Sequence, residues 1–193
     1  MNSNISNSTL KKYAKMASEV FMEDPVYKSV CKNKWLRKKL IYHGVLIRLY
    51  DSAKKDIFYF DRQGRGMLVL KDVKRQYQIS ELMKCPNAMA LIFLAPYVVK
   101  LFGILGQFNN RSVLGEDVYT ISPVFVGKEY QRQGVAASLV KRAVADMKEK
   151  GLKVGLDTQN PVNKEIYERI GFTLVKQEFL EKEQIDNYYM LFE

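Results

Sequence analysis

The stretch Tyr130-Gln-Arg-Gln-Gly-Val-Ala-Ala-Ser-Leu-Val140 decides the fold of this chain. It follows an apolar run over residues 118–126, which predicts a strand, and it leads into a helical pattern over residues 134–150. A tight glycine turn between a strand and a helix presents unpaired backbone N–H groups and the positive end of the helix dipole to an anion. Gly134 and Ala136 carry little or no side chain, so a diphosphate has room to approach the backbone.

The elements around this stretch predict a mixed α/β fold. Apolar residues at helical spacing predict further helices at residues 10–21, 34–50, 80–110 and 160–170. Short β-rich runs predict strands at residues 57–61, 66–71, 113–126, 153–157, 172–179 and 187–192. We therefore expect a mixed, mostly antiparallel central sheet flanked by helices, in a single domain over residues 1–193.

The composition is typical of a folded domain, with 47% hydrophobic and 27% charged residues. Cys31, Cys85 and the single histidine have no metal-ligand spacing, so we expect no metal and reduced thiols in a cytoplasmic protein. The N-terminus shows no signal-peptide pattern. Pro96 and Lys100 interrupt the most apolar stretch, residues 88–108, so we expect a buried helical hairpin there and no membrane contact.

The positive charge is confined to the first part of the chain. Residues 1–110 carry 19 Lys and Arg against 8 Asp and Glu, a net charge of +11, whereas residues 111–193 carry 12 against 13, a net of −1. The basic segment Lys28–Lys39 holds six basic residues and no acidic one. We interpret it as a solvated basic face, and attraction of an anionic partner is the alternative. No ribonucleoprotein-like motif is visible, so nucleic acid is not an expected partner.

Two motifs in register make the chain resemble the GNAT (GCN5-related) N-acetyltransferase superfamily, especially its members that act on small molecules. The acyl-CoA loop of that superfamily, Gln/Arg-x-x-Gly-x-Gly/Ala, matches Gln131-Arg-Gln-Gly134-Val-Ala136. A second signature, Asn followed by Tyr seven residues on and then Gly-Phe, matches Asn160, Tyr167 and Gly171-Phe172. The resemblance covers residues 112–180, and it implies a GNAT-like acyl-CoA N-acyltransferase fold.

The resemblance also implies that acetyl-CoA is the co-substrate, bound by residues 111–193, while residues 1–110 form the acceptor side. The N–H groups of Gln133 to Ala136 would hold the CoA diphosphate. The backbone of Val124 and Val126 would pair with pantetheine, and the Val126 N–H would stabilise the thioester oxyanion. The implied cofactor-binding residues are Val124, Phe125, Val126, Gln131, Arg132, Gln133, Gly134, Val135, Ala136, Ala137, Asn160, Asn163 and Tyr167.

Tyr167 would act as the general acid that protonates the leaving thiolate, because a phenol with a pKa of about 10 is protonated at neutral pH. The attacking amine must be neutral, so a base has to take its proton. Glu116 or Asp117 is the candidate base that the resemblance implies, and Asp157 at the end of the next strand is another. The alternative is that these are solvated carboxylates and that Tyr167 is a core aromatic. His43 is better explained as a packed or surface residue of a helix.

The implied activity is transfer of acetyl from acetyl-CoA to a primary amine of a small molecule, by direct attack in a ternary complex of a monomer or homodimer. A positive field on the acceptor side disfavours a polyamine, so we expect an amine that is neutral overall or carries an acidic group. The alternatives are a protein N-terminal or lysine acetyltransferase, a non-catalytic CoA-binding regulator, and a basic nucleic-acid-binding module.

Overall fold

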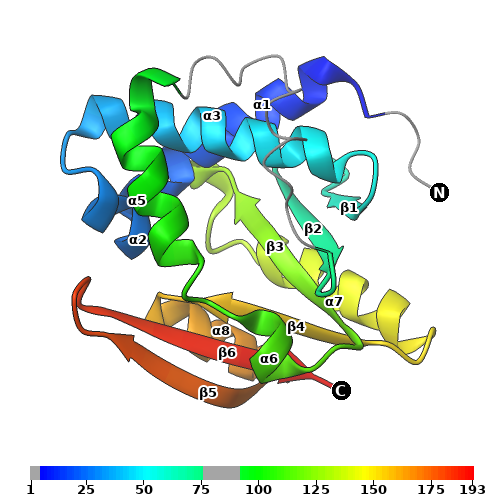
Figure 1. Cartoon of the computed structure of the whole chain (residues 1–193). Coiled ribbons are helices and arrows are strands. Elements are labelled where there is room, and N and C mark those ends of the chain that lie inside the picture. The colour runs from blue at the N-terminus through cyan, green and yellow to red at the C-terminus, as the bar shows by residue number, and fades with distance from the viewer. Residues whose placement is uncertain (1–4, 76–91) are drawn as a thin grey trace.

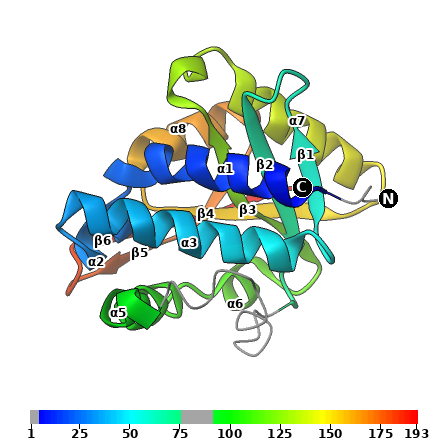
Figure 2. The ribbon, with the colours of Figure 1, turned by 90° about the horizontal axis from the view of Figure 1, so that it is seen from above.

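The computed structural model describes residues 5–75 and 92–193. They form one six-stranded sheet in the order β1-β2-β3-β4-β6-β5, in which only the β3–β4 pair is parallel. Helices α7 and α8 cover one face, and α1, α3 and α5 lie on the other (Figures 1 and 2). The expected mixed, mostly antiparallel α/β fold is therefore confirmed.

The strands are β1 (Ile57–Phe60), β2 (Gly66–Asp72), β3 (Val118–Val126), β4 (Lys153–Thr158), β5 (Thr173–Leu180) and β6 (Ile185–Phe192). The α-helices are α1 (Asn7–Val20), α2 (Pro25–Val30), α3 (Lys34–Ser52), α5 (Ala95–Leu105), α6 (Asn110–Leu114), α7 (Val135–Lys148) and α8 (Pro161–Ile170). Short 3₁₀ segments lie at η1 (Phe21–Glu23), at residues 92–94 and at η3 (Lys128–Tyr130).

Strand β2 is buried on both faces because its alternate side chains enter two different cores. Met67 and Val69 pack with α1 and α3, whereas Leu68 and Leu70 pack with α7. All four are fully buried. Burying each such side chain contributes about 1.5–3 kcal/mol, so these two cores fix the middle of the sheet between its helical layers.

The apolar segment after β2 differs from the expected buried hairpin. Its described part contains one α-helix, α5, whose outer face is exposed at Val99 (72%). Phe93, just before this helix, is also exposed (90%), and residues 80–91 of the prediction lie outside the described residues. Pro96 does not break this helix because it lies in the first turn, where proline is tolerated.

Among the described residues, one stretch, Ile92–Leu114, is apolar and long enough by composition to be a candidate membrane span, with a mean hydropathy of 1.4. Within it, helix α5 has 11 residues. At 1.5 Å per residue that is roughly 16 Å, about half the thickness of a bilayer's hydrocarbon core. The continuous helix is therefore too short to cross a membrane by itself.

The start of the central strand also differs from the prediction, which placed it at residue 113. The side chain of Asn109 accepts a hydrogen bond from the Ser112 N–H (3.1 Å) and starts α6, so residues 110–114 are helical. Gly115 then turns the chain with a φ of +100°, and β3 begins at Val118. A local cap thus decided the conformation of a segment that has strand-like composition.

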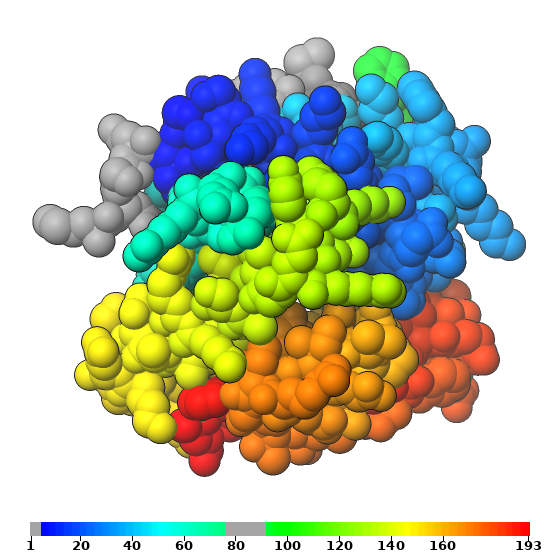
Figure 3. Space-filling view, turned by 180° about the vertical axis from the view of Figure 1, so that it is seen from behind, coloured from blue at the N-terminus to red at the C-terminus, as the bar shows by residue number. Residues whose placement is uncertain are grey.

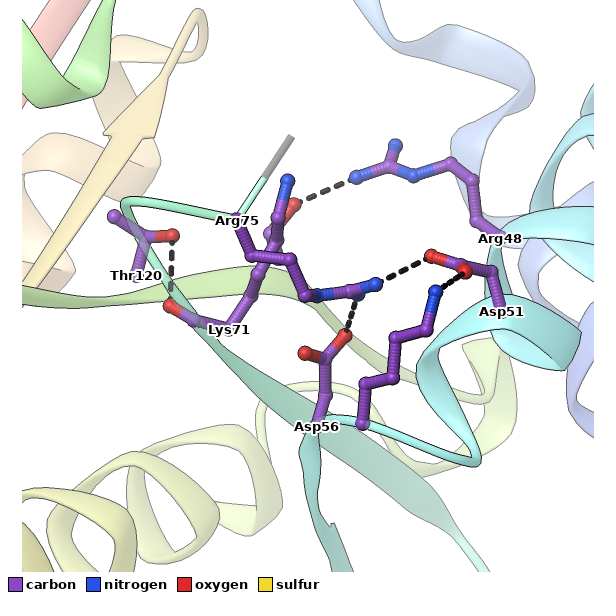
Figure 4. A network of polar contacts seen from close by, with 8 residues as sticks. Arg48, Asp51, Asp56, Lys71, Arg75 and Thr120 are labelled. Atoms are coloured by element: carbon purple, nitrogen blue, oxygen red, sulfur yellow. Dashed lines mark hydrogen bonds and ion pairs between the residues drawn. The ribbon is translucent and has the colours of Figure 1, made fainter. Parts of the chain in front are cut away.

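An ionic network ties the end of α3 to the end of β2 (Figure 4). Arg75 donates to Asp51 (2.6 Å) and to Asp56, and Lys55 donates to Asp51 (2.9 Å). Burial acts to raise the pKa of Asp51, but the hydrogen bonds from Lys55 and Arg75 outweigh it and lower that pKa. The pKa of Asp56 is raised, because its burial outweighs its bonds to Ser52 and Arg75. Arg75 therefore holds two buried carboxylates at one point of the fold.

Candidate active site

The sheet opens between β3 and β4. The two strands pair only from Val118↔Lys153 to Thr120↔Gly155, although β3 continues to Val126 and β4 to Thr158. The register of β2 with β3 shifts between Leu68 and Leu70, so β3 carries an extra residue just after it leaves β4. Within the described residues, the β4-facing edge of residues 121–126 has no strand partner, and a V-shaped gap results.

The backbone of Val124 and Val126 points into this gap. In an antiparallel pair, hydrogen-bonded and non-hydrogen-bonded residues alternate. Gly127 donates its N–H to the Arg65 carbonyl (2.9 Å), so Val126 and Val124 occupy non-hydrogen-bonded positions opposite β2. Their N–H and C=O groups therefore face the open edge. This is the arrangement that an extended pantetheine chain needs in order to pair as an additional strand.

The predicted anion-binding loop lies at the open end of β3. Arg132 and Gly134 have left-handed backbones, with φ of +61° and +75°, and α7 begins directly after them. Among residues 5–75 and 92–193, nothing accepts a hydrogen bond from the N–H groups of Gln133, Gly134 or Val135. A cradle of free N–H groups at the positive end of a 14-residue helix suits a phosphate group.

The side chains of this loop shape it rather than block it. Gln131 donates to the Val126 carbonyl (3.4 Å) and Gln133 donates to the Glu129 carbonyl (3.0 Å). Both side chains are thus folded back on their own loop, while Val135 is buried in the core and Ala136 packs against it. Seen from behind, the loop lies directly beside the start of α8, with a depression between them (Figure 3).

Helix α8 brings the second motif to the same gap. Asn160 caps this helix by accepting the Val162 N–H (3.0 Å), and Asn163 is half-buried in its first turn. The Tyr167 ring packs edge-on against Phe172 at 5.7 Å, and its hydroxyl makes no hydrogen bond with the described residues. Burial, with a further contribution from the negative charge of Asp157, raises the pKa of Tyr167 well above its usual value. The phenol therefore stays protonated and able to donate at neutral pH.

The structure does not bring Glu116 and Asp117 to this gap. Both are exposed and precede β3, at the end where the strands are closed, whereas Val126 lies eight residues after Val118, roughly 26 Å along the strand. Glu116 pairs with Arg111 (2.6 Å), and Asp117 pairs with Lys74 (2.8 Å), whose hydrogen bond lowers the Asp117 pKa. The geometry gives neither residue a direct contact with a reacting amine near Tyr167.

Two other carboxylates lie where the gap is open. Asp157, near the end of β4, accepts hydrogen bonds from Asn110 (2.6 Å) and Gln159 (2.9 Å). Asp24 caps α2 by accepting the N–H groups of Val26 (3.0 Å) and Tyr27. From the sequence alone, Asp24 before Pro25 predicts only the start of a helix. No sequence pattern predicts that Asp24 lies beside the gap.

An apolar cavity of about 50 Å³ lies between α2, α3 and α5. Its lining residues are Tyr27, Leu40, Gly44, Ile47, Arg48, Val98, Leu101, Phe102 and Leu105. Among these, Arg48 is the only charged residue, and it donates to the Ser122 hydroxyl on β3 (2.6 Å). Within the described residues, no group of three or more His, Cys, Asp or Glu side chains is arranged to hold a metal ion.

Comparison with known proteins defines the class. The family profile described as an acetyltransferase (GNAT) domain matches residues 61–190. The chain therefore belongs to the GNAT family of acetyltransferases. No curated protein that was compared matches the sequence.

Several solved structures are similar to the chain at low sequence identity. An N-acetyltransferase from Staphylococcus aureus Mu50 aligns over 100% of both chains with a TM-score of 0.63 and 15% identity. A putative streptothricin acetyltransferase from Bacillus anthracis str. Ames, solved with acetyl coenzyme A, has 19% identity and a TM-score of 0.45 over 72% of this chain and 63% of its own. The Escherichia coli ribosomal-protein-S18-alanine N-acetyltransferase matches over 39% of this chain and 53% of its own, with 22% identity and a TM-score of 0.36.

Proposed function

We propose that the protein transfers an acetyl group from acetyl-CoA to a primary amine of a small molecule. The observation that carries this proposal is the open edge of β3, which leads directly from Val124 and Val126 to the free N–H groups of the Gly134 loop. A CoA molecule needs these two features in this order, because its pantetheine arm and its diphosphate are consecutive parts of one chain.

The reaction follows from this placement. The Val126 N–H polarises the thioester carbonyl and stabilises the oxyanion that forms when the amine attacks. The C–N bond forms, the C–S bond breaks, and Tyr167 donates its proton to the leaving thiolate. Holding both substrates in one complex supplies much of the rate, because the attack becomes effectively intramolecular.

The acceptor side favours a small molecule with an apolar part. The cavity between α2, α3 and α5 is small and lined by aliphatic and aromatic side chains, which suits a compact apolar group better than a polypeptide chain. Arg48 at its wall favours an acceptor that also carries an acidic group. A polyamine is disfavoured for the same reason.

Melting temperature with and without acetyl-CoA, at low and high salt, tests the cofactor site. A ligand at 100 times its Kd stabilises the folded state by about 2.7 kcal/mol, and the shift should shrink at high salt because the phosphates are anionic. Absence of a shift with any acyl-CoA would contradict the proposed site. A screen of amino-acid-like amines against spermidine and an aminoglycoside, followed by thiol release, then tests the acceptor class, and preference for the polycations would refute it.

A further inference from the structure

Two carboxylates belong to segments on opposite sides of the open gap, and they lie close enough for the charge of Asp157 to act on the pKa of Asp24. Asp24 lies between η1 and α2, and this segment is anchored to β3 because the Phe21 ring packs edge-on against Phe125 at 5.7 Å. Asp157 belongs to β4, on the other wall. Tyr167 reaches the same region from α8, which packs on β4. The two sides of the gap thus contribute one carboxylate each, and the charge of Asp157 acts on the pKa of both Asp24 and Tyr167.

Asp24 has the properties of a poised base. Its Oδ1 is held by the N–H groups of Val26 and Tyr27, while its Oδ2 makes no hydrogen bond with the described residues. Burial raises the pKa of Asp24, the two N–H bonds act against this, and the charge of Asp157 raises it further. A carboxylate whose pKa is moved toward neutrality is a better proton acceptor at physiological pH.

Two polar groups near Asp24 and Asp157 make no hydrogen bond with the described residues. Asn110 directs its Nδ2 to Asp157, so its Oδ1 faces elsewhere, and this oxygen is buried without a hydrogen bond from the described residues. Leaving a buried polar group unsatisfied costs about 1–3 kcal/mol. The Tyr167 hydroxyl is also without a partner among the described residues. A site that offers two carboxylates is suited to a ligand that carries N–H donors and a positive charge.

We propose that Asp24 and Asp157 form the acceptor-amine site, which binds a primary amine as its ammonium ion, and that Asp24 takes the proton before attack. This inference rests on the proposed acetyltransferase function, and it adds the charge state of the acceptor and the identity of the base. Asp157, fixed by Asn110 and Gln159, places the second carboxylate of this site.

The proton balance is complete. The ammonium transfers one proton to the Asp24 carboxylate, which becomes the neutral acid, and the free amine attacks the thioester carbon. The tetrahedral intermediate loses a second proton from nitrogen to Tyr167 as Tyr167 gives its own proton to the sulfur of the departing CoA. Asp24 then releases its proton to solvent, so that each turnover forms one amide, one free thiol and one proton.

Asp24→Asn is the sharpest test, because Asn caps a helix about as well as Asp and leaves α2 in place. We expect kcat/KM for the amine to fall by about 100-fold or more, as for loss of a general base, while the Kd for acetyl-CoA is unchanged. The matched control is Asp72→Asn. Asp72 is also half-buried and also accepts the N–H of the residue two positions on (2.8 Å), but it lies at the far end of β2.

The outcomes separate the two proposals. If the wild-type protein acetylates amines of the screen and Asp24→Asn does so equally well, the acceptor-amine site is refuted and the proposed function stands. If the wild-type protein acetylates none of them, the proposed function fails. The acceptor-amine site is then tested by the binding of a ligand rather than by activity. In that case simple alkylammonium ions should raise the melting temperature of the CoA-bound wild-type protein, and Asp24→Asn should abolish the shift. A shift that persists in Asp24→Asn, or none in the wild-type protein, overturns the site.

Discussion

Gly134 and Gly151 stand at the two ends of α7, and both have left-handed backbones with φ of +75° and +67°. A Cβ at either position would meet no atom within 4 Å, so replacement by alanine costs only the backbone strain, about 1–2 kcal/mol. Gly134→Ala and Gly151→Ala should therefore lower the melting temperature by similar amounts. Only Gly134→Ala should also weaken acetyl-CoA binding, measured by calorimetry. Equal affinities for the two variants would show that the Gly134 loop does not hold the cofactor.

Tyr167→Phe removes one hydroxyl and keeps the ring that packs against Phe172. The melting temperature and the Kd for acetyl-CoA should stay close to wild type, while kcat should fall by about 10²–10⁴, the usual contribution of a general acid. Steady-state thiol release measures the effect. An unaltered rate would assign Tyr167 to the core only, and it would favour a different proton donor.

The stability of Asp24→Asn should depend on pH in a defined direction. Because the pKa of Asp24 is raised on folding, its ionisation opposes the folded state once the pH rises above the unfolded value of about 3.9. Asn carries no charge, so the variant should gain in melting temperature relative to wild type as the pH rises from 4 to 8. A difference that is constant over this range would contradict the raised pKa.

At the scale of elements, Arg75 connects α3 to the end of β2 through Asp51 and Asp56. Arg75→Met leaves two buried carboxylates without their main cation, which should lower the free energy of unfolding by about 3–5 kcal/mol. Arg62→Met at an exposed position is the control, and it should change stability by less than about 0.5 kcal/mol. Urea unfolding of both variants measures the two free energies. A small loss of stability for Arg75→Met would show that the network is not needed to stabilise the fold.

The cavity between α2, α3 and α5 gives the element-scale test of acceptor size. Gly44 lines it within α3, and a Cβ there would meet nothing within 4 Å. Gly44→Val directs its side chain into the cavity and should lower kcat/KM for amines with a branched apolar group by about 10-fold or more, whereas small amines are less affected. Gly103→Val on the exposed face of α5 is the matched control. Equal acceptor profiles for both variants would exclude the cavity from the acceptor site.

At the scale of the whole molecule, the two parts of the sheet share only three parallel residue pairs between β3 and β4. The proposed cofactor contacts both parts, through the β3 edge on one side and α8 on the other. Acetyl-CoA should therefore slow amide hydrogen exchange both in Val124–Val126 and at the start of α8, by up to roughly 100-fold at 100 times its Kd. Protection confined to one of the two would contradict a cofactor that lies across the gap.

The sequence by itself determined the features that depend on neighbouring residues. The strand, glycine turn and helix around Gly134, the cap at Asn160 and the fold class all follow from local patterns, because N-caps, left-handed glycines and apolar periodicity act within a few residues. The same locality explains one error, since a cap at Asn109 overrode the strand-like composition that follows it.

Only the tertiary structure decided which distant residues meet. The parting of β3 and β4 brings Asp24, Asp157 and Tyr167 to one gap, although Asp24 lies more than a hundred residues before the other two along the chain. It also leaves Glu116 and Asp117 at the closed end, in ion pairs on the surface. Strand order and register set these positions, and they arise from packing across the sheet rather than from any pattern along the chain.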